Sequence, residues 1–271
     1  MRKLMGFLLL ACWQVCLYAG NYEVVSPDGK LKVALTVSDG LGMEVFYDGQ
    51  SLFGALNMGL CLQQQPFKPV ARSVKRSSVN EIITPVVPLK FVSVANHYNA
   101  LRLNLKGNLA IEFRAYDDGM AYRFVTNGDG KKTLVYNETA DFYLPEAVLH
   151  LQQPVGFKTP YEEPYSHVAM KEWKDGSKFA LLPLLVDTKK GVKLLFSESD
   201  LYDYPCMFLK ANEGKGVSAL FPRYPLETKP ISDRSVNVVR EADYIAETQA
   251  KRTFPWRYVV VAREDSDLVE N

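Results

Sequence analysis

The sequence predicts an all-β fold made of antiparallel strands, with little helix. Apolar and polar residues alternate in short runs, and this period of two is typical of strands with one buried face. Turn residues separate the runs, and no stretch before Ser266 keeps a 3.6-residue period. With 271 residues, 47% of them hydrophobic and 23% charged, the chain can bury a large core as one domain.

The first twenty residues have the pattern of a secretory signal peptide. Arg2 and Lys3 give a positive start, residues 6–15 are apolar, and small residues follow. We expect residues 1–20 to be removed and the protein to be secreted. A lipoprotein box ending at Cys12 and a buried N-terminal strand are less favoured alternatives. The apolar run is too short for a membrane span.

The charge balance argues against nucleic acid as a partner. The formal net charge is +1, and removing Arg2 and Lys3 with the signal changes it to −1. The densest basic run, residues 72–76, has no interleaved aromatic side chains on which bases would stack. We therefore expect no nucleic-acid binding.

Two cysteines remain once the signal is removed. Cys12 and Cys16 lie within residues 1–20, whereas Cys61 and Cys206 belong to the mature chain. An oxidising compartment permits a disulfide between them, but two buried thiols fit the sequence equally well. The pairing stays open.

The first part of the mature chain predicts a meander of hairpins. Alternating residues 31–37 and a second run, residues 43–47, are bounded by Asp39-Gly40 and Asp48-Gly49, and Asp-Gly is a strong hairpin signal. Residues 51–90 are less regular, and we expect loops around one or two edge strands there.

Residues 101–105 and 109–113 predict a further hairpin with one buried face. Two more strands follow within residues 114–124, joined through Asp117-Asp118-Gly119. The two aspartates are either a metal or acid/base pair or a solvated turn in which Gly119 has a positive φ. We favour the turn, because adjacent strand residues point in opposite directions. Arg114 and Arg123 are expected to pair with acids inside the sheet.

Two loops rich in proline, residues 143–146 and 159–165, carry aromatic and acidic side chains. Aromatic faces beside carboxylates suit sugar binding, but tyrosines next to proline also anchor loops to a core, and we favour that role for Tyr161 and Tyr165. Trp256, beside Pro255, is likewise expected to be packed in the core.

The remaining strands are predicted from short apolar runs. Residues 179–186 read as a strand buried on both faces, with an irregularity at Pro183. Residues 217–221, 236–239 and 258–262 are further strands. Asp267, three residues before Glu270, predicts the start of a helix. We expect residues 21–262 to form the β domain and residues 263–271 to begin a linker.

Glu198 is the most unusual charged residue in the chain. It lies in residues 194–209, LLFSESDLYDYPCMFL, where an apolar strand runs into an acidic turn at residues 197–200. Strand parity places Glu198 on the same face as Leu194 and Phe196. Such a carboxylate must stay in water, pair with a cation or shift its pKa, and a metal ion would also satisfy it.

Common catalytic signatures are absent from the sequence. There is no Gly-x-Ser-x-Gly elbow, no phosphate-binding glycine loop and no Cys-x-x-Cys pair. The three histidines, His97, His150 and His167, lack metal-ligand spacing, which argues against zinc catalysis. We assign no catalytic residue to this chain.

Five motifs together resemble the N-terminal domain of glycoside hydrolase family 97. In order they are RAYDDGMAYRF at residues 114–124, YEEPY at 161–165, LLFSESDLYDYPCMFL at 194–209, FPRYPL at 221–226 and RTFPWR at 252–257. The resemblance covers essentially the whole mature chain.

The resemblance implies both a fold and a function. Family members are secreted, calcium-dependent, exo-acting α-glucosidases or α-galactosidases, typical of carbohydrate-degrading bacteria with a periplasm, which is therefore the expected compartment. They have an N-terminal β-super-sandwich of the galactose-mutarotase-like type, a catalytic (β/α)-barrel and a small C-terminal β domain. The N-terminal domain packs on the barrel and contributes one glutamate to a calcium site, which by motif match is Glu198.

This chain ends before the barrel, so we expect it to be inactive alone and to bind calcium weakly, since calcium requires roughly six to eight oxygen ligands. The expected partners are a catalytic barrel and, in the complete enzyme, an α-linked oligosaccharide. Two alternatives stay open. One is a carbohydrate-binding module that uses Tyr161, Tyr165 and Trp256, and the other is a subunit that docks a separate barrel.

Overall fold

A computed structural model describes residues 20–144 and 146–270, and all of its paired strands are antiparallel. Helix is confined to one 3-10 turn, Met170–Glu172, and to α1, Asp267–Glu270. The all-β prediction is confirmed. The predicted signal peptide lies outside the described residues, apart from Gly20. Among the described helices, none is long and apolar enough to cross a membrane.

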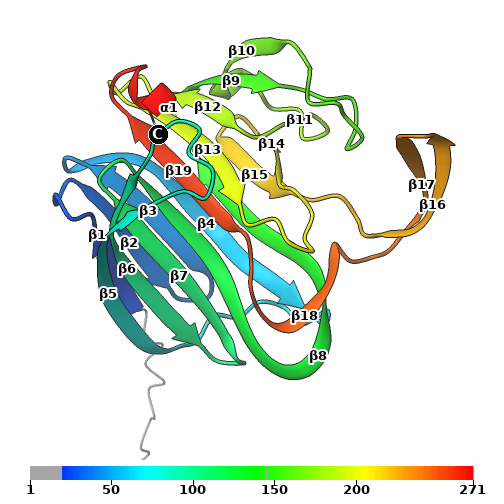
Figure 1. Cartoon of the computed structure of the whole chain (residues 1–271), viewed down its shortest axis with the longest axis horizontal. Helices are drawn as coiled ribbons and strands as arrows, with labels where there is room; N and C mark the ends of the chain where they lie inside the picture. Colours follow the sequence, from blue (N-terminus) through cyan, green and yellow to red (C-terminus); the bar gives the residue numbers. More distant parts are fainter. Residues whose placement is uncertain (1–19, 145, 271) are drawn as a thin grey trace, which may run out of the picture.

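The strands follow one another with short connections (Figure 1). The first nine are β1 (Gly20–Val25), β2 (Leu31–Val37), β3 (Leu41–Tyr47), β4 (Gln50–Leu62), β5 (Ala71–Ile83), β6 (Val94–Leu105), β7 (Leu109–Tyr116), β8 (Gly119–Tyr143) and β9 (Val148–Gln152). The others are β10 (Tyr165–Ala169), β11 (Phe179–Ala180), β12 (Leu184–Asp187), β13 (Lys193–Ser199), β14 (Phe208–Asn212), β15 (Gly216–Leu220), β16 (Pro225–Ser232), β17 (Ser235–Glu241), β18 (Ala246–Thr253) and β19 (Trp256–Ala262).

Strand β8 joins two layers, because its two halves pair with different neighbours. The first half pairs with β7 and β19, in a layer that runs β5, β6, β7, β8, β19, β13, β12, β9, β10. The second half pairs with β4 and β15, in a layer that runs β1, β2, β3, β4, β8, β15, β14, β11. Strand β18 pairs with both halves. This is the predicted antiparallel sandwich.

The core lies between the two layers. Phe196 of β13 packs against Phe53 of β4 and Phe142 of β8, with ring centroids 5.3 Å apart in each case. These aromatic contacts join the layers close to the end of β13. Burial of these side chains fixes which face of each strand points inward.

The predicted hairpins form as expected. Asp48 and Gly49 connect β3 to β4, both with positive φ, as a two-residue turn of the primed type requires. Strands β6 and β7 pair Leu103 with Ile111 and Leu101 with Phe113. The predicted helix also begins at Asp267, whose Oδ2 accepts hydrogen bonds from the backbone nitrogens of Arg263 and Glu264.

Three local predictions are wrong in whole or in part. Residues 51–90 do contain two strands, and β5 lies at the edge of its layer, but each strand runs for 13 residues and β4 lies inside its layer, where register shifts hide its alternation. Residues 179–186 form two strands, separated around Pro183, instead of one. The acidic turn at residues 197–200 is strand up to Ser199, because residues 197–199 pair with β19.

Gly119 also differs from its prediction. Its φ is not positive, and it begins β8 instead of occupying the turn. A Cβ at this position would lie 2.5 Å from the backbone oxygen of Val259 in β19. Glycine is therefore required by the close approach of two strands, a contact between distant parts of the sequence.

Strands β16 and β17 stand apart from both layers. Within the described part of the chain they pair with each other and with no other strand, and they form a hairpin that projects from the body, at the right of Figure 1. Nearly every residue in this hairpin is exposed.

Candidate functional site

Glu198 lies near the end of β13, on the face that strand parity predicted. Its neighbours on that face, Leu194 and Phe196, are fully buried in the core, and the Glu198 side chain is only 7% exposed. In the sheet register Glu198 is directly opposite Arg257 of β19. The carboxylate therefore points into the protein and pairs with a cation, one of the outcomes that its position required.

Two groups hold the Glu198 carboxylate. The backbone nitrogen of Met207 donates to both oxygens, at 3.0 Å to Oε1 and 3.1 Å to Oε2. Arg257 Nη1 pairs with Oε2. The segment between β13 and β14 thus folds back over the end of β13 and fixes the orientation of Glu198.

Glu138, from the second half of β8, completes this cluster. Arg257 donates from Nε to Oε1 at 2.9 Å and from Nη2 to Oε2 at 3.0 Å. The hydroxyl of Tyr204 donates to Oε2 at 2.9 Å. Because β19 and the second half of β8 lie in different layers, Arg257 ties the two layers together through this two-point contact.

The cluster carries more negative than positive charge. Two carboxylates, Glu138 and Glu198, share one guanidinium, so the ionised cluster has a net charge of −1. Burial raises the pKa of Glu198, and the charge of Arg257 offsets this only in part. Burial opposes the charge on Arg257, but the two carboxylates outweigh it and raise the pKa of the guanidinium. Burial also raises the pKa of Tyr204, which keeps its hydroxyl as a donor.

The family-like motifs meet around this cluster. Trp256 is buried between two guanidinium groups, 4.3 Å from Arg114 and 4.2 Å from Arg123. Arg257, next in sequence, lies 5.2 Å from the ring of Phe221. Four separate motifs therefore contribute to one region, and Trp256 is packed as expected.

The prediction for the two arginines holds for only one of them. Arg123 Nε pairs with Glu112 at 2.7 Å. Arg114 instead donates to the Tyr116 hydroxyl at 3.3 Å and stacks on aromatic rings. The aromatic faces replace the expected carboxylate as the partner of its charge.

The other candidates, Asp117 and the histidines, are not among the residues that contact the cluster. Asp117 Oδ1 accepts the backbone N–H of Asp28 at 2.9 Å, which supports a structural role for that turn. His150 and His167 face each other across β9 and β10 with their Nδ1 atoms 2.5 Å apart, a pairing that their spacing did not predict. Within the described residues, no three histidine, cysteine or acidic side chains are grouped as a metal site.

One of the loop tyrosines, Tyr161, and one of the cysteines, Cys206, lie close to Glu198. The Tyr161 hydroxyl donates to Cys206 Sγ at 3.4 Å, and burial and the neighbouring thiol raise the Tyr161 pKa. Tyr165 is more exposed than Tyr161 and lies on β10. Cys61 and Cys206 are both free thiols, which settles the open question of a disulfide.

Sequence reasoning missed Glu138, although a signal was present. Glu138 shares strand parity with Ala140 and Phe142, which are both buried, so the argument that found Glu198 applies to it as well. Arg257 likewise shares parity with Val259 and Val261. A sequence search for charged residues on apolar strand faces would have found all three members of the cluster.

The oxygen atoms around Glu198 can be compared with the ligands that calcium requires. Glu198 supplies carboxylate oxygens, the ligand type that calcium prefers, and the cluster has one uncompensated negative charge. Met207 and Arg257 leave acceptor capacity on Oε1, since an ionised carboxylate offers about four lone-pair sites. These residues therefore fit calcium only as the source of one of the roughly six to eight oxygen ligands that it requires.

Comparison with known proteins agrees with the earlier resemblance. Residues 24–271 match the protein-family model described as Glycosyl-hydrolase 97 N-terminal. The chain is 31% identical over 285 aligned positions to a retaining alpha-galactosidase from Bacteroides thetaiotaomicron. The match covers 99% of this chain but only 43% of that protein.

Solved structures share the fold. A glycoside hydrolase family 97 enzyme from Pseudoalteromonas sp. strain K8, in complex with acarbose, has a TM-score of 0.76 at 17% identity, over 92% of this chain and 36% of that one. A beta-arabinopyranosidase has a TM-score of 0.73 at 20% identity, over 89% of this chain and 40% of that one. The chain thus spans less than half the length of the proteins it matches.

Proposed function

Because this chain belongs to glycoside hydrolase family 97 as its N-terminal domain, we propose that it completes the active site of an exo-acting α-glycosidase. In the complete enzyme it packs on a catalytic (β/α)-barrel, and Glu198 contributes one ligand to a calcium ion. The substrate class is an α-linked oligosaccharide. The general acid and the residue that attacks the sugar or activates water belong to the barrel, so this chain alone hydrolyses nothing.

The charge balance around Glu198 is the observation that carries this proposal. Two carboxylates and one guanidinium leave a charge of −1 in a site that is almost closed to water, and such a charge is costly without a further cation. A calcium ion held mainly by barrel carboxylates would supply it. When bound, calcium would orient a sugar hydroxyl and stabilise developing negative charge.

The residues of this chain have positioning roles in the proposal. Met207 and Arg257 hold the Glu198 carboxylate in one orientation. Glu138 and Tyr204 in turn hold Arg257 from the opposite layer. A ligand fixed in this way needs no rearrangement when the barrel and the ion arrive.

Secretion is part of the same proposal. Residues 1–20 have the charge and apolar pattern of a signal peptide, and the periplasm is the expected compartment. N-terminal sequencing of the protein from a periplasmic extract should give a first residue at or near Asn21. A mature protein that retains Met1 in the cytoplasm would contradict this part.

A hybrid enzyme tests the central claim. Residues 21–271 replace the matched part of the Bacteroides alpha-galactosidase, and hydrolysis of an α-galactoside is measured with calcium and with a chelator. Glu198→Gln should reduce kcat/KM by about tenfold or more, the size of effect typical when a metal-site residue is lost. Glu213→Gln is the matched control, since Glu213 is a highly exposed glutamate of the same chain.

Three results would contradict the proposal. The first is a Glu198→Gln hybrid that is as active as the unchanged hybrid. The second is a hybrid whose activity is unaffected by the chelator. The third is hydrolysis by the separate 271-residue chain. Isothermal titration of that separate chain with calcium should show only weak binding, and Glu198→Gln should abolish it.

A carbohydrate-binding module is the second candidate function. The observation in its favour is the exposure of Tyr161 and Tyr165 on neighbouring segments. Trp256 is buried and lies against the guanidinium groups of Arg114 and Arg123, so it is a poor platform for a sugar. Titration of the separate chain with maltose or melibiose distinguishes the two, because measurable binding that Tyr165→Ala removes would favour the module.

A further inference from the structure

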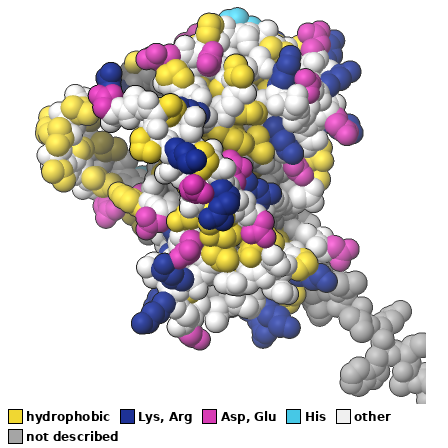
Figure 2. Space-filling view, turned by 90° about the vertical axis from the view of Figure 1, so that its right-hand side faces the viewer, with side chains coloured by type: hydrophobic (Ala, Val, Ile, Leu, Met, Phe, Trp, Pro, Cys, Tyr) yellow, Lys and Arg dark blue, Asp and Glu magenta, His cyan; other side chains and the backbone are white. Residues whose placement is uncertain are grey.

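The β16–β17 hairpin has an apolar surface that no residue of the described ranges, 20–144 and 146–270, covers. Its exposed apolar side chains are Leu226, Ile231, Val236, Val238 and Val239. Figure 2 shows hydrophobic side chains gathered on this projecting part of the molecule, with a hollow between it and the body. A concentration of exposed apolar side chains on one element is typical of an interaction surface.

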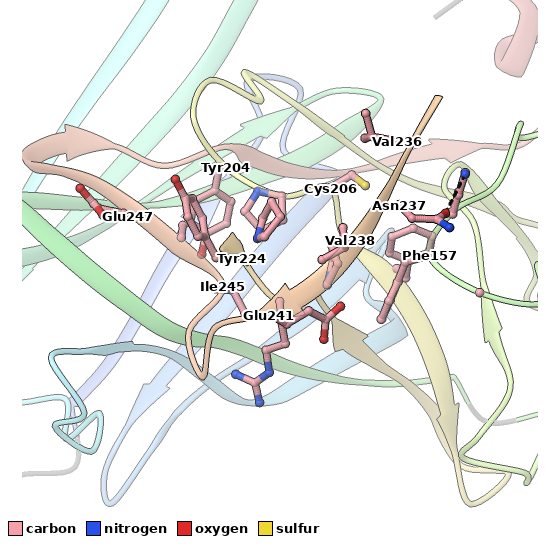
Figure 3. Close-up of a pocket in the computed structure, with 18 of the residues that line it drawn as sticks. Phe157, Tyr204, Cys206, Tyr224, Val236, Asn237, Val238, Glu241, Ile245 and Glu247 are labelled. Atoms are coloured by element: carbon pink, nitrogen blue, oxygen red, sulfur yellow. Dashed lines mark hydrogen bonds between the residues drawn. The ribbon is translucent and has the colours of Figure 1, made fainter. Parts of the chain in front are cut away.

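A groove of about 870 Å³ separates the hairpin from the body. Val236 and Val238 line it from the hairpin, and Phe157, Ile245 and Cys206 line it from the body (Figure 3). Lys158, Arg223, Glu241 and Glu247 are charged residues of the same lining. The groove therefore combines apolar and charged side chains, as protein–protein interfaces do.

The hairpin has little support from its own chain. Its two strands pair only with each other, and an isolated two-stranded hairpin is at best marginally stable in water. A side-chain contact to the body is the hydrogen bond from Lys158 Nζ to Asn237 Oδ1, 3.1 Å long and exposed (Figure 3). A partner that fills the groove would therefore stabilise the hairpin as well as cover it.

The groove is also connected to the Glu198 cluster. Cys206 lines the groove, and its sulfur accepts a hydrogen bond from the Tyr161 hydroxyl. The next residue, Met207, donates its backbone N–H to the Glu198 carboxylate. Tyr204 lines the groove as well and donates to Glu138. An occupant of the groove would lie beside the cluster that carries the uncompensated charge.

We propose that this groove is the docking site for the catalytic domain that follows the matched region in the family relatives, and that the β16–β17 hairpin clasps that domain. The inference rests on the proposed function. The relatives supply the candidate occupant, because this chain accounts for 43% of the alpha-galactosidase and matches a domain described as N-terminal. The element that enters the groove should present a few apolar side chains flanked by polar ones.

Hydrogen exchange of the hairpin amides tests the proposal. The full chain is measured alone, then with the remaining part of the Bacteroides alpha-galactosidase, both mixed and joined in one polypeptide to remove the effect of weak affinity. Alone, β16 and β17 should exchange faster than the β6–β7 hairpin, which lies in a layer. With the catalytic part present, exchange in β16 and β17 should slow by about tenfold or more.

Variants show whether the groove is responsible. Val236→Asp with Val238→Asp should abolish the protection, because a charge in the apolar centre resists desolvation. The control is Ile82→Asp, an exposed apolar residue on the paired strand β5 that does not line the groove. The control should leave the protection of the hairpin unchanged.

Three outcomes overturn the proposal. The first is a joined polypeptide in which β16 and β17 exchange as fast as in the separate chain. The second is protection that survives the two aspartate substitutions. The third is slow exchange of the hairpin amides in the chain alone at high concentration, together with a dimer in analytical ultracentrifugation. That result would show that the groove binds a second copy of the chain. Calcium-dependent hydrolysis lost in Glu198→Gln, together with a freely exchanging hairpin, would leave the proposed function intact and reject only this docking site.

Discussion

Arg257 donates two hydrogen bonds to Glu138, from Nε to Oε1 at 2.9 Å and from Nη2 to Oε2 at 3.0 Å, and the two side chains are almost completely buried. This pair joins the two layers of the sandwich. Glu198 shares the same guanidinium but is not needed to neutralise it. The two-point contact with Glu138 therefore leaves Glu198 as the second carboxylate on one guanidinium, held by a single contact to Arg257.

Arg257→Met should destabilise the protein far more than Glu198→Gln. Without Arg257, two buried carboxylates face each other with no cation, and loss of one partner of a buried ion pair typically costs about 3–5 kcal/mol. Glu198→Gln leaves Arg257 paired with Glu138 and keeps an oxygen for Met207, so its cost should be about 1 kcal/mol or less. Urea unfolding of the two variants decides between these values. Equal losses would mean that Glu198 is primarily structural.

The stability difference between the wild type and Glu198→Gln should depend on pH. Burial raises the pKa of Glu198 above its ordinary value of 4.5, so the folded state binds the proton more firmly than the unfolded state. Between the ordinary and the raised pKa the folded state holds more protons, and stability falls as pH rises. The wild type should therefore lose stability relative to Glu198→Gln as pH increases from 4.5 toward neutrality. A relative gain over that range would show that Arg257 outweighs burial.

Gly216→Ala should be strongly destabilising for a steric reason. A Cβ at position 216 would lie 1.7 Å from the backbone oxygen of Phe142, so β15 and β8 would have to separate. The cost should be about 3 kcal/mol or more, at the upper end for overpacked sites. Gly40→Ala is the control, because nothing lies within 4 Å of the added Cβ, and it should change stability by less than about 1 kcal/mol. Thermal unfolding of both variants measures the contrast, and similar midpoints would contradict it.

The two cysteines of the mature chain should both react as thiols. Cys61 and Cys206 are unpaired and partly accessible, so unfolding without reductant should give two alkylated cysteines by mass spectrometry. Both should react more slowly in the folded protein than after unfolding, since Cys61 Sγ donates to the Gln65 carbonyl and Cys206 Sγ accepts from the Tyr161 hydroxyl, each at 3.4 Å. A mature chain that takes up no alkylating reagent would instead show a disulfide.

Much of the fold could be predicted because strand patterns are local. The β3–β4 turn follows from Asp48-Gly49, and the pairing of Leu101 with Phe113 follows from two matching runs of alternating residues. The failures arise where neighbours distant in sequence decide. Gly119 is glycine because Val259 approaches it, and β4 forms a long inner strand because β3 and β8 flank it.

The amino-acid sequence by itself determined the face on which Glu198 lies, because side chains alternate along a strand whatever it pairs with. It could not determine the partners of that carboxylate. Arg257 lies 59 residues from Glu198 in the sequence. Glu138 lies on a strand of the opposite layer, 119 residues from Arg257. Only the packing of the two layers brings these three charges together, so that two carboxylates share one guanidinium.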